Sequence, residues 1–314
     1  MNKKLFLSMF AAAGMLLATS CSNDELDVVQ SGNEAQVTFS LAAEGGIETR
    51  AISDGTGAKK LVYAVYKLNA QGEPELQKVV GSDENSQFVD DAAFDNGLTE
   101  TVEITLAKGQ TYQVAFWAQN PNCGAYNTDN LTAVSVNYNA AVNNDELRDA
   151  FFKTEEFTVA GDKSIDVVMK RPFAQINVGV TAEDWNAAVG SGIEIEKSQV
   201  VINNAATSIN LLTGAVQGDA EVTYTLNGIP AEELKVDADG DGTKEAYKWL
   251  SMSYILVNDT HDADEDQDGT LGDYRTTLNS LQYTFEPENG NSIAFAEGLN
   301  SVPVQRNWRT NILG

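Results

Sequence analysis

Two acidic segments in the second half of the chain have the residue types and spacing of calcium-binding loops. The first carries Asp237, Asp239 and Asp241 at alternate positions, followed by Gly242. Calcium prefers about six to eight oxygen ligands, and a D-x-D-x-D-G pattern wraps carboxylates around one ion while the glycine permits a sharp turn. Glu245 is placed to supply a further ligand. We therefore predict a calcium site in this loop.

The second segment repeats the pattern with Asp264, Asp266 and Asp268. The match to an EF-hand is incomplete in both loops, because Lys248 and Arg275 stand where the bidentate glutamate is expected. The alternative interpretation is a pair of solvated acidic loops with no ion. Calcium is the only cofactor that the sequence suggests.

Residues for catalysis are scarce. The chain contains one histidine, His261, which lies in the second acidic segment and not in a packed element. Cys123 lies in a loop, N-P-N-C-G-A-Y, with no obvious base beside it. The sequence contains no G-x-S-x-G, H-E-x-x-H, Walker or G-x-G-x-x-G motif. A pair of working carboxylates is not ruled out among so many acids, but we predict that the protein is not an enzyme.

The other cysteine, Cys21, follows a segment with the layout of a bacterial export signal. Lys3 and Lys4 precede an apolar run over residues 5–18, and the small residues Thr19 and Ser20 come directly before the thiol. The run L-A-T-S-C resembles a lipobox, so we predict a signal peptide over 1–20 and acylation of Cys21, with palmitate among its acyl chains. The alternative is an ordinary secreted protein. The lipid would place the protein on the outer membrane or cell surface.

The charge of the chain limits its partners. The formal net charge is −26, and the mature chain would carry about −28 after Lys3 and Lys4 leave with the signal. Such a surface repels nucleic acid and anionic lipid. Residues 21–34 are polar and acidic, and we expect them to form a tether. With Cys21 acylated, Cys123 has no partner for a disulfide.

Short alternating segments predict the elements that carry these residues. Val37, Phe39 and Leu41 alternate with polar or small residues, which is typical of a half-buried strand. Residues 59–69 are apolar on both faces, as in a central strand. Residues 99–120 read as two strands, and we expect A-K-G-Q at 107–110 to join them as a hairpin.

Helix signals are few and strands continue to the end of the chain. We expect short helices over 143–152 and 181–189, the second with Thr181 and Asp184 in capping-box spacing. The pattern predicts an all-β protein of two tandem antiparallel β-sandwiches with Greek-key, transthyretin-like topology and one or two short helices. We expect the first domain over 35–170 and the second over 171–314.

Four segments, in order along nearly the whole mature chain, carry a family resemblance. They are K-G-Q-T-Y-Q-V-A-F-W-A-Q-N at 108–120, D-A-F-F-K-T-E-E-F-T-V at 149–159, V-M-K-R-P-F-A-Q-I-N-V-G-V-T-A-E-D-W at 168–185 and V-P-V-Q-R-N-W-R-T-N-I-L-G at 302–314. The chain resembles the Bacteroidales fimbrillins, the type V pilin subunits and fimbrillin-like surface lipoproteins. The resemblance implies a structural or accessory fimbrial subunit that acts in cell adhesion.

The resemblance also implies a route of assembly. Family members are exported as lipoproteins, and an arginine-specific protease then cuts a loop and frees the first strand. Arg50 and Ala51 flank the matching bond in I-E-T-R-A-I-S-D-G, although a plain loop arginine is the alternative. Loss of the strand would open a groove that a strand of another pilin subunit fills, giving a homo- or heteropolymer.

One departure leaves a second function open. The chain stops at Gly314, where family members usually continue with further strands that include the donor strand. The second domain would then be shortened, or this member would accept a strand without donating one. The alternative is a surface lipoprotein that binds glycans or host proteins and does not polymerise. Trp117, Trp185 and Trp308 are the candidates for stacking on sugars.

Overall fold

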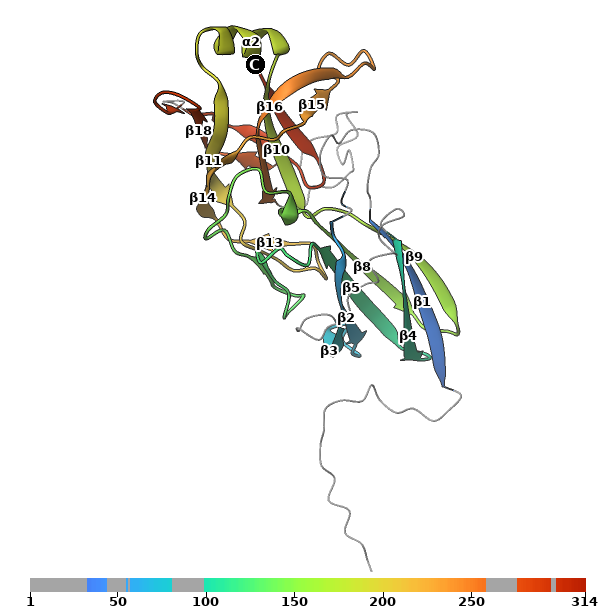
Figure 1. The fold of residues 1–314 in the computed structure, drawn as a ribbon. Helices are drawn as coiled ribbons and strands as arrows, with labels where there is room; N and C mark the ends of the chain where they lie inside the picture. Colours follow the sequence, from blue (N-terminus) through green and yellow to red (C-terminus); the bar gives the residue numbers. More distant parts are fainter. Residues whose placement is uncertain (1–32, 44–54, 56, 81–98, 258–275, 295–297) are drawn as a thin grey trace, which may run out of the picture.

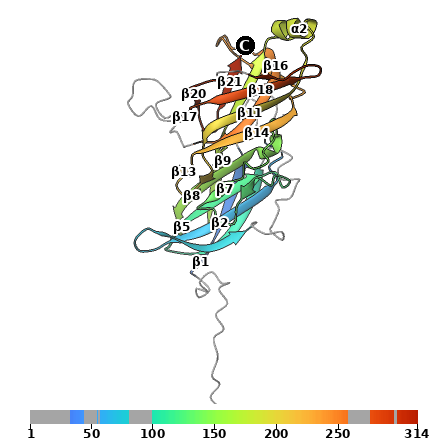
Figure 2. The ribbon, with the colours of Figure 1, turned by 90° about the vertical axis from the view of Figure 1, so that its left-hand side faces the viewer.

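The computed structural model describes residues 33–43, 55, 57–80, 99–257, 276–294 and 298–314. Cys21, Arg50, Ala51 and the second acidic segment with Asp264, Asp266 and Asp268 lie outside the described residues. The described part is built of β-strands with one α-helix, so the predicted all-β fold is confirmed. Two groups of sheets are stacked along the long axis of the molecule, with the helix and the carboxyl end at the far end of the second group (Figures 1 and 2).

The first sheet has three strands in the order β4-β1-β9. They are β1 (Glu34–Ala43), β4 (Thr99–Ala107) and β9 (Lys163–Met169). β1 lies in the middle, antiparallel to β4 and parallel to β9. Its residues alternate between exposed and buried, as the sequence pattern predicts.

The second sheet is covered on both faces. Its order is β3-β2-β5-β8, formed by β3 (Pro74–Val80), β2 (Lys60–Leu68), β5 (Thr111–Gln119) and β8 (Ala150–Thr158). Leu61 and Val65 of β2 pack in the core shared with the first sheet. Val62 and Ala64 pack in a second core that extends through the rest of the molecule. The prediction of a central strand apolar on both sides is confirmed.

The predicted hairpin at 107–110 is wrong. β4 pairs with β1, whereas β5 pairs with β2 and β8, so the connection passes from one sheet to the other. The physical reason is burial: β4 buries one face through alternate residues, while β5 is almost entirely buried and requires layers on both sides. The turn is fastened to other segments, because Lys108 N donates to Asn33 O (2.7 Å) and Gly109 N donates to Val159 O (2.7 Å).

Of the two predicted helices, one forms. α2 (Ala182–Gly190) is capped by Thr181, whose side chain accepts from Asp184 N. The helix expected over 143–152 is only a 3-10 turn, η1 (Glu146–Arg148). Ala150 and Phe151 continue instead as the start of β8, because both side chains are fully buried in that strand.

The second group of sheets follows Met169. One sheet has the order β15-β16-β10-β21, with β15 (Glu233–Val236), β16 (Glu245–Leu256), β10 (Phe173–Val180) and β21 (Arg309–Leu313). The other has the order β14-β11-β18-β19, with β14 (Ala220–Gly228), β11 (Ile195–Ala205), β18 (Leu281–Pro287) and β19 (Ile293–Ala294). A short pair adds β17 (Thr276–Leu278) and β20 (Val302–Val304). Side chains from both larger sheets contribute to the second core.

A small sheet between the two groups contains strands from both halves of the sequence. Its order is β13-β12-β7-β6, formed by β13 (Val216–Gln217), β12 (Ser208–Ile209), β7 (Val134–Val136) and β6 (Tyr126–Asn127). Backbone pairing therefore crosses the domain boundary that we predict at residue 170. The boundary itself stays a prediction.

A buried ion pair fastens the chain where it passes into the second group of sheets. Arg171 donates to Asp149 through Nε (2.5 Å to Oδ1) and Nη2 (2.6 Å to Oδ2), and both residues are at most 5% exposed. The guanidinium also lies 4.3 Å from the ring centre of Phe151. The Arg171 backbone N–H donates to Asn307 Oδ1 (3.3 Å), near the end of the chain. Arg171 therefore connects three distant segments.

We expect Arg171→Ala to lower the free energy of unfolding by about 3–5 kcal/mol, because it leaves the buried Asp149 carboxylate without its cation. Urea denaturation followed by fluorescence measures this loss. The matched control is Lys170→Ala, since the neighbouring Lys170 side chain is exposed. Equal losses of unfolding free energy in the two variants would show that the buried ion pair does not stabilise the fold.

Candidate functional site

The candidate site is β1 together with the walls that enclose it. Five alternate side chains of this strand face the first core, and none is more than 7% exposed: Ala35, Val37, Phe39, Leu41 and Ala43. The intervening side chains face outward or are half-buried. β1 therefore fills a slot with small residues at its two ends and the largest side chain at its centre.

Phe39 is the central anchor of the strand. It is fully buried, and its ring makes edge contacts with Phe116 of β5 (centroids 5.1 Å apart) and with Phe157 of β8 (5.5 Å). Edge-to-face pairs of this kind add about 0.5–1.5 kcal/mol to the free energy of burial. Phe39 thus gives β1 two aromatic contacts with the opposite sheet, in addition to the apolar packing of its other buried side chains.

Backbone pairing holds β1 along both of its edges. Glu34 to Ala42 pair with β4, and Val37 to Ala43 pair with β9. Withdrawal of the strand would leave two facing edges with unpaired N–H and C=O groups. Those edges would lie one strand apart, which is the geometry that accepts an added strand on both sides at once.

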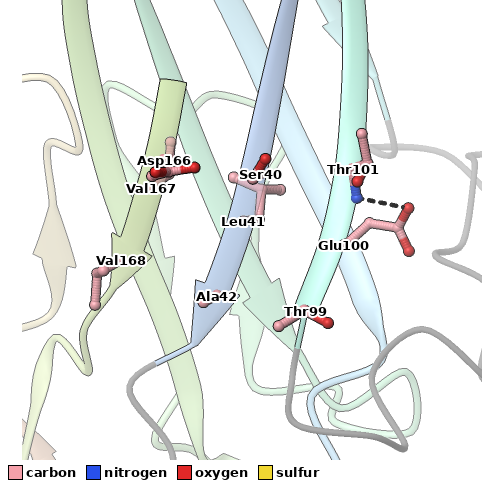
Figure 3. A pocket seen from close by; sticks show the side chains of 9 residues that line it. All are labelled: Ser40, Leu41, Ala42, Thr99, Glu100, Thr101, Asp166, Val167 and Val168. Atoms are coloured by element: carbon pink, nitrogen blue, oxygen red, sulfur yellow. Dashed lines mark hydrogen bonds between the residues drawn. The ribbon is translucent and has the colours of Figure 1, made fainter. Parts of the chain in front are cut away.

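The amino end of β1 is held by polar contacts at the surface. Gln36 N donates to Asp162 Oδ1 (3.0 Å), and Gln36 Nε2 donates to Glu103 Oε2 (2.7 Å), both at exposed positions. Near the carboxyl end, an open depression of about 420 Å³ lies where β4, β1 and β9 run side by side (Figure 3). Ser40 and Ala42 contribute to its lining. The segment that follows β1 and contains Arg50 and Ala51 lies outside the described residues.

The first acidic loop brings its aspartates together. One carboxylate oxygen from each of Asp237, Asp239 and Asp241 lies within 4.8 Å of the others, and all three residues are exposed. Asp237 also accepts from the backbone N–H groups of Gly240 (2.7 Å) and Gly242 (2.9 Å). The loop is therefore held in shape by hydrogen bonds from its backbone N–H groups to the Asp237 carboxylate. The binding of calcium here stays a prediction.

Glu245, the fourth predicted ligand, lies at the start of β16 and its Oε2 accepts from Ala238 N (3.1 Å). Backbone amides therefore occupy the oxygens of Asp237 and one oxygen of Glu245. An ion would have to share these oxygens with the backbone or use their remaining lone pairs. The predicted carboxylate ligands therefore lie close together, but they do not form a complete coordination shell for calcium.

The aromatic candidates for sugar stacking separate into three environments. Trp117 is fully buried, and its Nε1 donates to Gln119 Oε1 (2.8 Å), so its candidacy for stacking on a sugar is wrong. Trp185 is half-buried, with the Lys248 ammonium 5.3 Å from its ring centre. Trp308 is 52% exposed. Of the three, Trp308 presents the most open ring.

Cys123 is a buried, free thiol within the described residues. Burial raises the pKa of this thiol above its usual value, which reduces the thiolate population at neutral pH. The geometry therefore gives no support to a nucleophilic cysteine. His261 lies outside the described residues.

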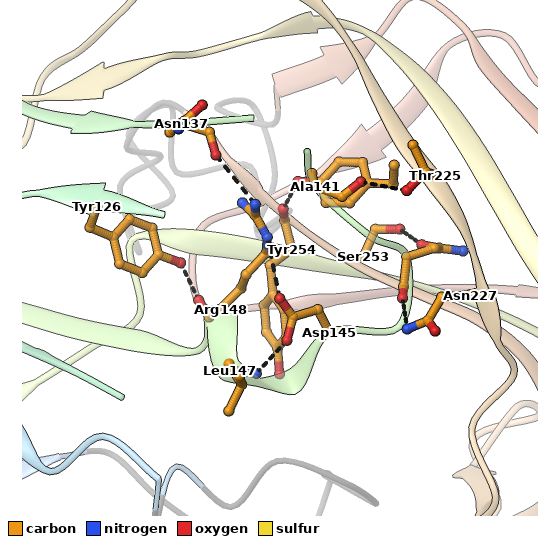
Figure 4. A network of polar contacts seen from close by, with 12 residues as sticks. Tyr126, Asn137, Ala141, Asp145, Leu147, Arg148, Thr225, Asn227, Ser253 and Tyr254 are labelled. Atoms are coloured by element: carbon orange, nitrogen blue, oxygen red, sulfur yellow. Dashed lines mark hydrogen bonds and ion pairs between the residues drawn. The ribbon is translucent and has the colours of Figure 1, made fainter. Parts of the chain in front are cut away.

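A buried polar network that the sequence did not reveal joins residues 137–148 to the second group of sheets (Figure 4). Asn143 is fully buried, and its Nδ2 donates to Ser198 Oγ (2.9 Å) and Ser251 Oγ (2.7 Å). Its Oδ1 accepts from Ser253 Oγ (2.7 Å), and its backbone oxygen accepts from Asn227 Nδ2 (2.8 Å). The only sequence signal was a polar N-N-D run, which we read as a helix start.

Arg148 continues the network toward the first group of sheets. Its guanidinium lies 5.9 Å from the ring centre of Tyr138 and 5.7 Å from that of Tyr224. Its Nε is 3.7 Å from Asp145 Oδ2, and its backbone oxygen accepts from the Tyr126 hydroxyl. Burial raises the pKa of Tyr138 to about 12, so its hydroxyl stays neutral at physiological pH. The network is structural and carries no nucleophile.

A model of the family described as "Family of unknown function (DUF6562)" matches residues 29–314. The comparison with curated proteins gives no match. In the described part, no helix is long and apolar enough to cross a membrane.

Solved structures of Bacteroidales proteins match this chain at low similarity. One is a protein of Bacteroides thetaiotaomicron proposed to bind polysaccharide (DUF1812), with 8% identity, 89% of this chain and 90% of that chain covered, and a TM-score of 0.45. Another, proposed as an adhesin of the same species, has 13% identity, coverage of 86% and 81%, and a TM-score of 0.41. A third, proposed as a cell adhesion protein of Parabacteroides distasonis, has 13% identity, coverage of 89% and 88%, and a TM-score of 0.42. None of the three is named as an enzyme, and we draw nothing on mechanism from likeness at this level.

We expect Phe39→Ala to lower the stability of the first sandwich by about 3–5 kcal/mol, because it empties the slot between the two phenylalanine rings. Chemical denaturation measures the loss, and Ser40→Ala on the exposed face is the matched control. A loss below about 1 kcal/mol would mean that the slot does not depend on this side chain.

Calcium should raise the melting temperature if the first acidic loop binds it. At about tenfold excess over Kd the gain is about 1.4 kcal/mol, and chelator should reverse it. Asp239→Asn combined with Asp241→Asn should abolish the shift, while Asp219→Asn, an exposed aspartate away from the cluster, should leave it unchanged. An unchanged melting temperature in millimolar calcium would contradict the prediction that the first acidic loop binds calcium.

Proposed function

The chain belongs to the DUF6562 family, a family of unknown function, and we propose that it is a cell-surface adhesion protein of the fimbrial subunit type. The observation that carries this proposal is the position of β1. The amino-terminal strand completes the middle of a sheet, and its alternate side chains fill the first core. A neighbouring molecule can supply an equivalent strand without changing the rest of the sandwich.

Exchange of this strand explains how such subunits would polymerise. A subunit that has lost β1 has an open groove lined by β4, β9 and the apolar residues of the opposite sheet. Insertion of a strand restores the backbone pairing on both edges and buries apolar surface again. Because donor and acceptor are different surfaces, the contact is heterologous and extends into a filament.

Export and anchoring form the second part of the proposal. The lysines, the apolar run and the small residues before Cys21 support a lipoprotein held at the outer membrane by acyl chains on that cysteine. Arg50 lies seven residues after the end of β1. A cut between Arg50 and Ala51 would separate β1 from the remaining chain and leave the strand held by non-covalent contacts alone.

A second candidate function is a surface lipoprotein that binds glycans or proteins and does not polymerise. The exposed ring of Trp308 favours this candidate, because an open indole is a stacking surface for a sugar. The two functions share the anchor and differ in whether β1 leaves the fold.

An arginine-specific protease should convert the purified protein, without its signal, from monomers into filaments visible by negative-stain electron microscopy. Of the other arginines, Arg148, Arg171 and Arg306 are buried and Arg309 is half-buried, while Arg275 lies outside the described residues. Arg50→Lys is the matched control, since it keeps the charge and removes the recognised residue. This variant should stay monomeric under the same treatment.

The outcome that contradicts strand exchange is also clear. If mass spectrometry shows cleavage after Arg50 and the product remains a monomer that retains β1, the protein is not a polymerising subunit. Loss of glycan binding in Trp308→Ala, in a protein that never polymerises, would then favour the second candidate.

A further inference from the structure

A groove in the second group of sheets lies apart from β1. It has a volume of about 510 Å³ and separates β14 from the segment over residues 136–140. Ala220 to Thr223 and Thr225 form one wall, and the other wall consists mainly of Val136, Asn137, Tyr138, Asn139 and Ala140. β14 is the terminal strand of its sheet, so only one of its edges is covered by β11.

The groove begins where a short parallel contact ends. Thr225 N donates to Ala141 O (2.9 Å), and Asn143 N donates to Thr225 O (3.0 Å), which places Val142 beside Thr225 in a parallel bridge. Ala140, next to this contact, has a φ of 73°. A residue with a side chain rarely takes this conformation, and the bend accompanies the loss of pairing upstream. The two segments form a fork that is closed at Val142 and Thr225.

Strand geometry determines which backbone groups face the open part of the fork. Thr225 directs both its N–H and its C=O away from β11, toward residues 141–143. Because a strand repeats every two residues, Thr223 and Glu221 direct their backbone groups to the same side. Among the described strands β14 pairs only with β11, so these groups of Glu221 and Thr223 face the groove. The open edge from Ala220 to Tyr224 is roughly 13 Å long at about 3.3 Å per residue, enough for a short added strand.

The lining identifies the class of ligand. Tyr138 is the only aromatic residue in it, and this ring is 9% exposed and packs against Tyr224 and Arg148. A sugar would therefore lack a stacking surface, whereas a peptide backbone would match the free edge. Glu221 is the only ionisable side chain of the lining apart from Tyr138, and the chain as a whole carries −26 charges. At this groove the negative charge favours a basic peptide of another protein over a second copy of this acidic chain.

We propose that the fork between β14 and residues 136–140 binds an extended basic peptide of another protein by addition of a strand to β14. The peptide pairs with the backbone of Glu221 and Thr223 and places a lysine or arginine beside the Glu221 carboxylate. This site is independent of β1 and of the fimbrial proposal, because its lining contains no residue of β1, β4 or β9. The fork would be available for peptide binding in a monomer and in a filament alike.

A fluorescein-labelled peptide that alternates lysine with valine is the probe, with fluorescence anisotropy as the measurement on the intact mature chain. We expect saturable binding that weakens as salt is raised. Glu221→Lys should weaken binding at least tenfold. Glu232→Lys, the same change at an exposed position outside the groove, should leave it within twofold.

Two further measurements separate strand addition from simple charge attraction. Thr223→Pro removes one backbone donor from the free edge, where proline is tolerated, and should weaken binding about tenfold with an unchanged melting temperature. Hydrogen exchange at the Glu221 and Thr223 amides should slow when the peptide is added.

The proposal is overturned if the basic peptide and an analogue with glutamate in place of lysine bind equally. It is also overturned if Thr223→Pro binds as the native protein does while the amides stay unprotected. Self-association lost in Thr223→Pro would instead assign the fork to a second copy, and glycan-array binding lost in that variant would assign it to carbohydrate.

Discussion

The middle position of β1 in its sheet is the constraint on which the first sandwich depends. An edge strand can leave a sheet at the cost of one ladder of hydrogen bonds, but a middle strand supports both neighbours. β4 and β9 are not paired with each other, so β1 alone makes them one sheet. Phe39 adds the contact that holds this sheet on the opposite one. The same arrangement that makes β1 necessary makes its slot specific for an alternating strand.

The β3-β2-β5-β8 sheet connects the first sandwich to the rest of the molecule. Its two faces belong to different cores, so a change in the first core acts on a layer that also supports the second. The Arg171 and Asp149 pair ties the start of β8 in this layer to the second group of sheets, and the Asn143 network ties the segment before η1 to the same group. Buried polar contacts require defined geometry, and they therefore fix how the two groups meet.

Period-two patterns made the strands predictable from sequence, and Val37, Phe39 and Leu41 are buried as their spacing indicates. Strand partners were less predictable: the turn at 107–110 has the residues of a hairpin, yet β4 and β5 belong to different sheets. The residue types at 107–110 predict a turn, whereas the strands that pair with β5 depend on the burial of both its faces. Asn143 and Arg171 were missed for a related reason, since their partners lie far away in sequence. The aspartates of the first acidic loop were found because their spacing is local.

The parallel pairing of β1 with β9 has a kinetic consequence. Gln36 contacts Asp162 across a separation of 126 residues, and the whole β1 to β9 ladder has a similar span. Contacts between such distant positions form late and slow the folding of a domain. The first sheet cannot close until the ribosome has made the chain through Met169, more than half of its length. A chain that emerges in this order keeps its first strand without one of its two neighbours until β9 has been made, so β1 is among the last parts to be fully paired.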